Sequence, residues 1–266
     1  MGRATLACGV AAVLLGGAVD HGRAAPAPDS LALETADRHP MRYELSLPRG
    51  WSPARRWPVV IALEAVGRDW RGTGRAFARA RGERPFIIAV PHIVTNGGHD
   101  LRHLSAYDYA DSTWDRVDRQ GGCRFDLEGL AAVIDDIHQR FAGEAQVFLT
   151  GWESGGHLLW AETFAHPEHL RGVAASATNY VGRCVDDSLF SISYTRGALP
   201  IRVFLPSADS ASAAPHGVLY RECQTVRELA RSHGYDNIRE AIVVGKPRGP
   251  LADDVMKFFA SLLTAD

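Results

Sequence analysis

Short, continuously apolar segments alternate along the chain with segments whose apolar residues recur every three or four positions. Runs such as WPVVIAL and PFIIAV are apolar throughout, which is typical of strands buried on both faces of a parallel sheet. We therefore predict strands at residues 42–47, 58–63, 86–91, 146–151, 171–177, 201–206 and 238–244. The amphipathic segments predict helices at residues 70–81, 127–141, 154–164, 218–232 and 251–263.

This alternation predicts an α/β fold with a mainly parallel central sheet and helices on both faces. Ligands of such sheets bind beyond the carboxyl ends of the strands. Two long segments between predicted strands, residues 96–123 and 180–199, are expected to form the rim of a cleft at that edge.

The amino-terminal region has the order of a secretory signal peptide. Arg3 precedes a mostly apolar run at residues 6–19, and small residues follow near position 24. The run is too short to span a bilayer as a stable helix. We expect a signal peptide at residues 1–25, a linker rich in Pro, Ala and Asp at residues 26–40, and one domain at residues 41–266. The protein is then secreted or periplasmic, and is not anchored in a membrane once the signal is removed.

The net charge of the chain argues against two classes of binding partner, nucleic acids and anionic membranes. The chain has 29 basic and 31 acidic residues, a net charge of −2, which provides no general attraction to nucleic acid or to anionic membranes. We expect neither as a partner, and we look instead for a small molecule in a pocket.

Three cysteines follow the predicted signal peptide. Cys123 and Cys184 lie in predicted loops, whereas Cys223 lies in an amphipathic helical pattern that would bury it as a free thiol. An exported protein favours pairing of two of the three. We predict a Cys123–Cys184 disulfide, the alternative being three unpaired cysteines.

The segment TGWESGG, residues 150–156, has the strand, sharp turn and helix context of a nucleophile elbow. A tight elbow needs small residues two positions before and two positions after its centre. Gly151 and Gly155 satisfy this requirement around Glu153. A centre at Ser154 would place Trp152 at a position that has no room for it. We therefore predict Glu153 at the centre.

Four segments together resemble the α/β-hydrolase superfamily, in particular its secreted esterase and polyhydroxybutyrate-depolymerase-like group. They are WPVVIAL, DLEGLAAVIDDI, TGWESGG and LPSAD, and the resemblance covers residues 41–266. It implies an α/β-hydrolase fold with a serine, a histidine and an acid as catalytic residues. Glu153 occupies the serine position, and Asp209 matches the acid unless it is merely a turn cap.

The other catalytic positions of the family are also altered. The loop that should carry the histidine contains Lys246 and Arg248, and no histidine follows His233. We assign the histidine position to Lys246, with Arg248 as the alternative, and expect a Glu153–Lys246 ion pair. The His-Gly pair that helps to form the family's oxyanion hole is replaced by Glu64 and Ala65. A carboxylate there would repel the negative charge that an oxyanion hole stabilises.

These substitutions favour a non-catalytic, ligand-binding pseudo-hydrolase, so whether the protein is an enzyme stays open at this point. One alternative is an esterase-like hydrolase with atypical carboxylate chemistry, in which Glu153 acts as nucleophile or general base. A lesser alternative is an esterase that uses Ser154 with a loop histidine. The fitting ligand is a small molecule, ester-like or carbohydrate-like.

We expect the binding cleft to be lined by residues around the elbow and the oxyanion loop: Glu64, Ala65, Trp152, Ser154 and His157. Aromatic residues of the same region would form an apolar wall or pack in the core: Trp152, Tyr107, Tyr109 and Trp114. His157 follows Glu153 by four residues and could share a metal with it, but we expect it to pack structurally. Loop histidines that could reach the cleft are His92, His99 and His103. We expect no metal and no cofactor.

Overall fold

The computed structural model describes residues 25–97, 101–185, 190–213 and 215–263. The predictions for the signal peptide and for His99 lie outside these residues. The strands are β1 (Ala32–Thr35), β2 (Arg42–Ser46), β3 (Val59–Leu63), β4 (Ile87–Pro91), β5 (Val147–Glu153), β6 (Leu170–Thr178), β7 (Ile201–Pro206) and β8 (Ile238–Val243). The helices are α1 (Trp70–Arg81), α2 (Asp111–Gln120), α3 (Gly122–Arg140), α4 (Gly156–Ala165), α5 (Val218–Ser232) and α6 (Ala252–Leu263).

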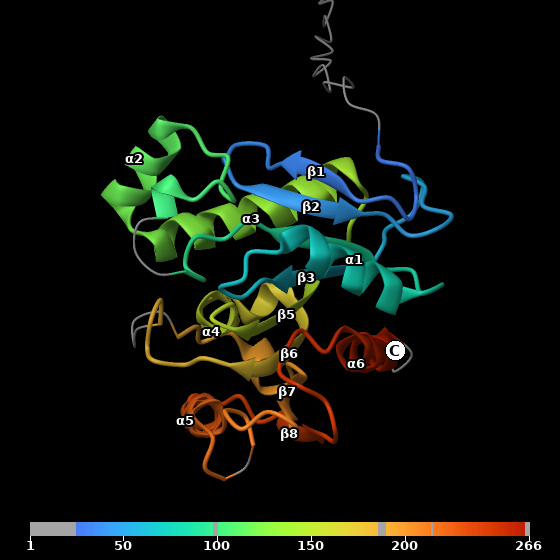
Figure 1. Ribbon diagram of the computed structural model, residues 1–266. Coiled ribbons are helices and arrows are strands. Elements are labelled where there is room, and N and C mark those ends of the chain that lie inside the picture. Colours follow the sequence, from blue (N-terminus) through green and yellow to red (C-terminus); the bar gives the residue numbers. More distant parts are fainter. Residues whose placement is uncertain (1–24, 98–100, 186–189, 214, 264–266) are drawn as a thin grey trace, which may run out of the picture.

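The strands form one sheet of eight in the order β1-β2-β4-β3-β5-β6-β7-β8 (Figure 1). β1 and β2 are antiparallel to their neighbours, whereas β4, β3, β5, β6, β7 and β8 are mutually parallel. β3 lies between β4 and β5, and every residue of β3 is buried. The predicted mainly parallel sheet is therefore confirmed, and the continuous apolar runs are its central strands.

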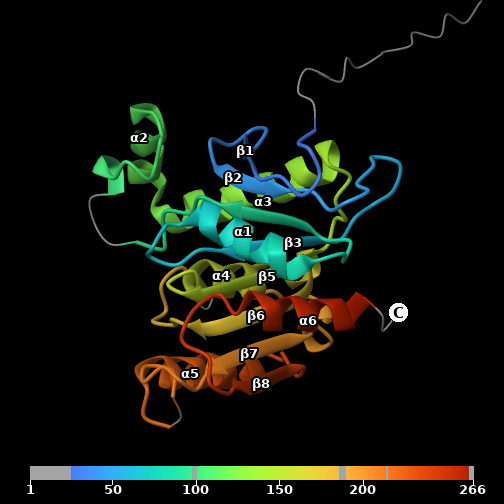
Figure 2. The same cartoon turned by 45° about the vertical axis from the view of Figure 1, so that its right-hand side comes forward.

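The helices lie in two layers, one on each face of the sheet. α1 contacts α6 on one face, while α3 and α4 contact each other and lie with α5 on the opposite face (Figures 1 and 2). None of the helices in the described part of the chain combines the length and the apolarity that a membrane crossing requires. The two layers bury the sheet, and ligands can reach it only at its edges and strand ends.

Two elements lie where the sequence did not predict them. β1 falls inside the expected linker and forms an antiparallel pair with β2, from Ala32 opposite Leu45 to Thr35 opposite Arg42. α2 falls inside the expected rim segment at residues 96–123. The linker prediction is wrong at β1 because a four-residue strand is stabilised by its partner strand and has no apolar period of its own.

The carboxyl ends of β3, β5 and β7 meet at the same edge of the sheet. β3 and β5 are in register from Val60 opposite Phe148 to Leu63 opposite Gly151. The next residues along these two strands are Glu64 and Trp152, so the loop after β3 runs beside the elbow after β5. This edge is where the candidate site lies.

Candidate functional site

Glu153 lies at the centre of the elbow, with a backbone φ of +44°. This left-handed conformation is strained for a residue other than glycine. A Cβ atom at Gly155 would lie 2.4 Å from the carbonyl oxygen of Leu63, and one at Gly151 would lie 3.3 Å from the carbonyl oxygen of Gly155. The predicted frame therefore has a steric basis, since the loop after β3 and the start of α4 leave no room for side chains.

The cation beside Glu153 is Arg248. Its Nε lies 3.0 Å from Oε1 of Glu153 and 3.9 Å from Oδ1 of Asp209. The Glu153 and Asp209 side chains are mostly buried, and that of Arg248 is 41% exposed. The elbow thus holds two carboxylates, Glu153 and Asp209, with one guanidinium beside both.

The expected Glu153–Lys246 ion pair is wrong, because Glu153 pairs with Arg248, the alternative that the sequence left open. The backbone oxygen of Lys246 accepts a hydrogen bond from the amide of Ala208 at 3.1 Å, which ties the loop after β8 to the loop after β7. Lys246 is exposed and lines a cavity of about 240 Å³ with Asp253 and Asp254 at the start of α6. This anchor places position 248, two residues later, at the elbow.

Asp209 is a turn cap, and its carboxylate also faces Arg248. Its Oδ2 accepts hydrogen bonds from the amide of Ser212 at 2.9 Å and from the Ser212 hydroxyl, which makes it a turn cap. Its Oδ1 is the oxygen nearer to Arg248. The cap orients the carboxylate, and the second oxygen is left for the cation.

Glu64 directly follows β3 and is buried, with 4% of its surface exposed. The Thr73 hydroxyl on α1 donates a hydrogen bond to Oε2 of Glu64. The pKa of Glu64 is raised to about 7, chiefly by burial and also by the nearby charges of Asp69 and Glu153, while hydrogen bonds from Thr73 and the Ala65 backbone act to lower it. The oxyanion loop therefore contains a carboxyl group that titrates near neutral pH.

Asn96 connects the loop after β3 to the elbow through hydrogen bonds, and the sequence did not predict it as a site residue. Its side chain is almost fully buried, and its Nδ2 donates hydrogen bonds to the carbonyl oxygens of Glu64 at 3.1 Å and Ala65 at 2.9 Å. Its own carbonyl oxygen accepts a hydrogen bond from the Ser154 hydroxyl at 2.9 Å. The only sequence signal was its position at the start of the long segment after β4, which does not distinguish it from any loop asparagine.

The Ser154 hydroxyl is therefore directed at a backbone carbonyl and is bonded to it. Ser154 lies one residue beyond the strained centre of the elbow. Both features count against its use as a nucleophile.

His157 is buried in α4 behind the elbow. Burial lowers its pKa to about 4, and the charged groups that also affect it are Arg183 and Glu222. Its Nδ1 has no hydrogen-bond partner among the described residues. Within those residues, the group of side chains close enough to hold a metal ion includes neither His157 nor Glu153.

The aromatic residues expected near the cleft pack mainly with one another. Trp152 is buried, and Tyr107 contacts Trp114 with ring centroids 5.5 Å apart. Tyr109 also contacts Trp114, at 5.9 Å. His92 is stacked on Trp70 at 4.2 Å and is buried beneath α1. Of these side chains, Tyr107 supports Asn96 directly, because its hydroxyl donates a hydrogen bond to Oδ1 of Asn96 at 3.0 Å.

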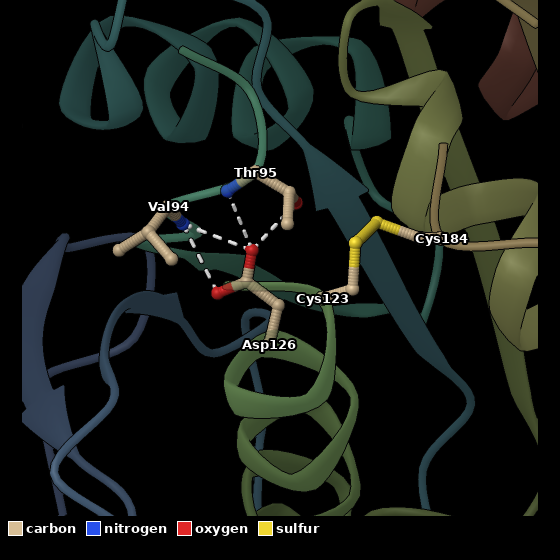
Figure 3. Close-up of a disulfide and its surroundings, with 5 residues drawn as sticks. All are labelled: Val94, Thr95, Cys123, Asp126 and Cys184. Atoms are coloured by element: carbon tan, nitrogen blue, oxygen red, sulfur yellow. Dashed lines mark hydrogen bonds between the residues drawn. A yellow bond between two sulfur atoms is a disulfide. The ribbon is translucent and has the colours of Figure 1, made fainter. Parts of the chain in front are cut away.

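The disulfide joins Cys123 at the start of α3 to Cys184 in the loop after β6, which confirms the predicted pair (Figure 3). Cys223 is a buried free thiol, as predicted. One turn further along α3, the carboxylate of Asp126 accepts hydrogen bonds from the amides of Val94 and Thr95 and from the Thr95 hydroxyl (Figure 3). Asp126 thereby fixes to α3 the two residues that precede Asn96.

Comparison with known proteins relates this geometry to solved structures. No family model matches the chain. An S-formylglutathione hydrolase (FrmB) from Staphylococcus aureus is similar over 91% of this chain and 100% of its own, with a TM-score of 0.61 and 10% identity. A predicted CIB-like hydrolase from Thermoplasma acidophilum is similar over 88% and 98%, with a TM-score of 0.52 and 15% identity.

A thermostable esterase is similar over 88% of this chain, with a TM-score of 0.54 and 14% identity. The match spans 62% of that esterase, which is less than two thirds of its length. At these identities the likeness concerns the fold. Together with the eight-stranded, mostly parallel sheet, it shows that the chain has the α/β-hydrolase fold.

Proposed function

We propose that the protein is a non-catalytic member of the hydrolase fold that binds a small ligand at the elbow and releases it unchanged. The observation that carries the proposal is the position of Arg248, whose Nε lies 3.0 Å from Glu153 and 3.9 Å from Asp209. The group beside the elbow is a guanidinium, which stays protonated at every pH at which the protein is folded and therefore cannot act as the base that a histidine would provide.

The elbow itself supports the proposal. Serine catalysis needs a hydroxyl next to a base that titrates near neutral pH. The centre of the elbow is a carboxylate paired with Arg248, and the nearest serine, Ser154, donates its hydrogen to the carbonyl of Asn96. Neither residue has a base beside it among the described contacts.

The oxyanion loop supports it as well. An oxyanion hole works by presenting hydrogen-bond donors where negative charge develops. Here the loop carries Glu64, and the Ala65 backbone donates toward the Glu64 carboxyl group. Above pH 7 the carboxylate would repel a tetrahedral intermediate.

The charges of the site define the ligand class. Arg248 is partly exposed, and its guanidinium can donate to an ester carbonyl or a carboxylate, while Glu153 and Asp209 can accept from hydroxyl groups. We infer a small ester-like or carbohydrate-like ligand. The N-terminal pattern and the disulfide support export to the periplasm or the medium, which mass determination of the mature amino terminus would test.

A screen of soluble esters, sugars and small carboxylates by thermal shift tests the proposal. We expect some ligand to raise the melting temperature of the wild type, to do so much less in Arg248→Ala, and to be recovered intact by chromatography. A fluorophosphonate probe should not label the wild type. Labelling of Ser154, or turnover of aryl esters by the purified protein, would refute the proposal.

Rebuilding the triad provides a sharper test with a matched control. The double variant Glu153→Ser, Arg248→His should acquire labelling by the fluorophosphonate, because serine, histidine and Asp209 then occupy one site. The control Glu153→Ser, Lys246→His introduces the same two residues but places the histidine at the exposed loop position, and it should stay unlabelled. Equal labelling of the two variants would contradict the assignment of position 248.

Carboxylate chemistry is a second candidate that one observation favours. The pKa of Glu64, raised to about 7, suits a general base, and its charge is coupled to that of Glu153. Glu153 would attack the carbon of an alkyl halide or an epoxide and form an ester, as halide leaves or as the epoxide C–O bond breaks and its oxygen takes a proton from water. Glu64 would then accept a proton from the water that hydrolyses the ester, which releases the alcohol and restores the Glu153 carboxylate. An adduct on Glu153, accumulating in Glu64→Gln, would support this mechanism; unmodified Glu153 in large substrate excess would exclude it for these substrates.

A further inference from the structure

A second cluster of chemically active side chains lies far from the elbow, in the sequence HPEH between α4 and β6. His166, Glu168 and His169 each present a ligand atom, and these atoms all lie within 4.8 Å of one another. The turn lies beside the start of β6, where Leu170 is opposite Val147, whereas Glu153 is opposite Thr178 at the far end of the same strand pair. The cluster is therefore at the amino edge of the sheet and independent of the candidate site.

We propose that His166, Glu168 and His169 bind a divalent transition-metal ion of the Zn²⁺ class, with Glu162 orienting His169. Two imidazoles and one carboxylate are a ligand set that zinc uses in proteins, with the remaining position taken by water. Imidazole ligands favour zinc and its transition-metal neighbours over Mg²⁺ and Ca²⁺, which prefer oxygen.

The spacing of the ligand atoms suits a tetrahedral ion. Two atoms that are each bonded to zinc at 2.0–2.1 Å lie about 3.3 Å apart at a tetrahedral angle. His166 Nδ1 lies 3.7 Å from Glu168 Oε1. The rings of His166 and His169 are stacked with centroids 4.9 Å apart and an interplanar angle of 17°, so the two side chains must rotate out of this stack to direct their lone pairs at a common ion.

Glu162 gives separate structural support for a metal site, because it holds one of the proposed ligands in place. Its carboxylate is 1% exposed, and its Oε1 lies 3.2 Å from His169 Nδ1, the nitrogen that donates to it. A buried carboxylate behind a histidine is the usual outer partner of a metal-ligating imidazole, because it fixes the ring and leaves the other nitrogen with a lone pair. His169 thus has its Nε2 available to an ion.

The backbone holds the ligands in place before any ion binds. The amide of His166 donates to the carbonyl of Glu162 at 2.9 Å, and the amide of His169 donates to the carbonyl of His166 at 3.0 Å. Pro167 between them has a fixed φ. The three ligand side chains are each nearly half exposed, which leaves access for the ion and for a completing water.

Metal titration of the full chain, prepared without a histidine tag and treated with chelator, tests the proposal. We expect one Zn²⁺ per chain by calorimetry, and Co²⁺ should give the visible absorption of a site with nitrogen and oxygen ligands. His166→Ala with His169→Ala should abolish both signals. Glu162→Gln, which preserves size, should weaken Zn²⁺ binding by about 10- to 100-fold.

His216→Ala is the matched control, because it removes an exposed histidine elsewhere in the chain and should leave binding unchanged. Glu168→Ala replaces an exposed ligand and should weaken binding even if Glu162→Gln folds poorly. Equal stoichiometry and affinity in the wild type and the double histidine variant would overturn the proposal, as would binding that the His216→Ala variant loses.

Discussion

The buried carboxyl group of Glu64 should make the stability of the protein depend on pH in a way that one substitution removes. In the folded state its pKa is raised from 4.5 to about 7, chiefly by burial. Between these two values the folded protein keeps a proton that the unfolded chain has already lost. Stability must therefore fall as pH rises through this window.

The size of the effect follows from the two pKa values. Each pH unit over which the folded state holds the extra proton lowers the free energy of unfolding by about 1.4 kcal/mol. A pKa raised from 4.5 to about 7 thus corresponds to about 3 kcal/mol lost by pH 8, where Glu64 is buried and charged. The Thr73 hydroxyl, which donates to Glu64, limits the loss but does not remove it.

The variant Glu64→Gln is neutral at every pH and resembles the protonated carboxyl group in shape. We expect it to match the wild type in urea unfolding at pH 4.5 and to be more stable by about 3 kcal/mol at pH 8. Other buried acids contribute equally to both proteins, so the difference between the two curves isolates Glu64. Glu83→Gln, at an exposed acid, should leave the pH dependence unchanged. Parallel wild-type and Glu64→Gln curves would refute the reasoning.

Three further outcomes test the geometry by chemical unfolding. Gly155→Ala should lower the free energy of unfolding by at least about 3 kcal/mol, because the added methyl group would lie 2.4 Å from a carbonyl oxygen of β3. Gly151→Ala, whose methyl group would lie 3.3 Å from its nearest atom, should cost clearly less. Equal costs would contradict the close approach at Gly155. Replacing Cys123 and Cys184 together by serine removes a crosslink between residues 61 positions apart and should lower the free energy of unfolding by about 4 kcal/mol. An unchanged midpoint of chemical unfolding would show that the disulfide does not constrain the unfolded chain. Asp126→Asn exchanges an acceptor for an amide donor facing backbone amides and should cost roughly 2–3 kcal/mol, a prediction that fails if the variant unfolds like the wild type.

The local sequence pattern was sufficient to predict most of the helices and strands and the position of Glu153 at the centre of the elbow. The helix at Trp70–Arg81 and the strand at Ile201–Pro206 have the bounds that periodicity predicts, because each buries a face that its own residues define. Glu153 was placed at the elbow by the two flanking glycines, since a tight turn excludes side chains there in any protein of this fold. The pairing of Cys123 with Cys184 was predicted from two expected loops, although Cys123 lies in the first turn of α3.

What local pattern left open depends on contacts between distant segments. The cation beside Glu153 is Arg248 because a backbone hydrogen bond from Ala208 anchors Lys246, and sequence spacing does not encode such a loop register. Asn96 is a site residue only because β3, β4 and β5 bring its amide to the oxyanion loop. Glu64 acquires its raised pKa chiefly from burial in the folded protein. The periodicity of apolar residues indicates which face of a helix or strand a residue occupies. The residues that it contacts there depend on how distant segments pack together in the folded chain.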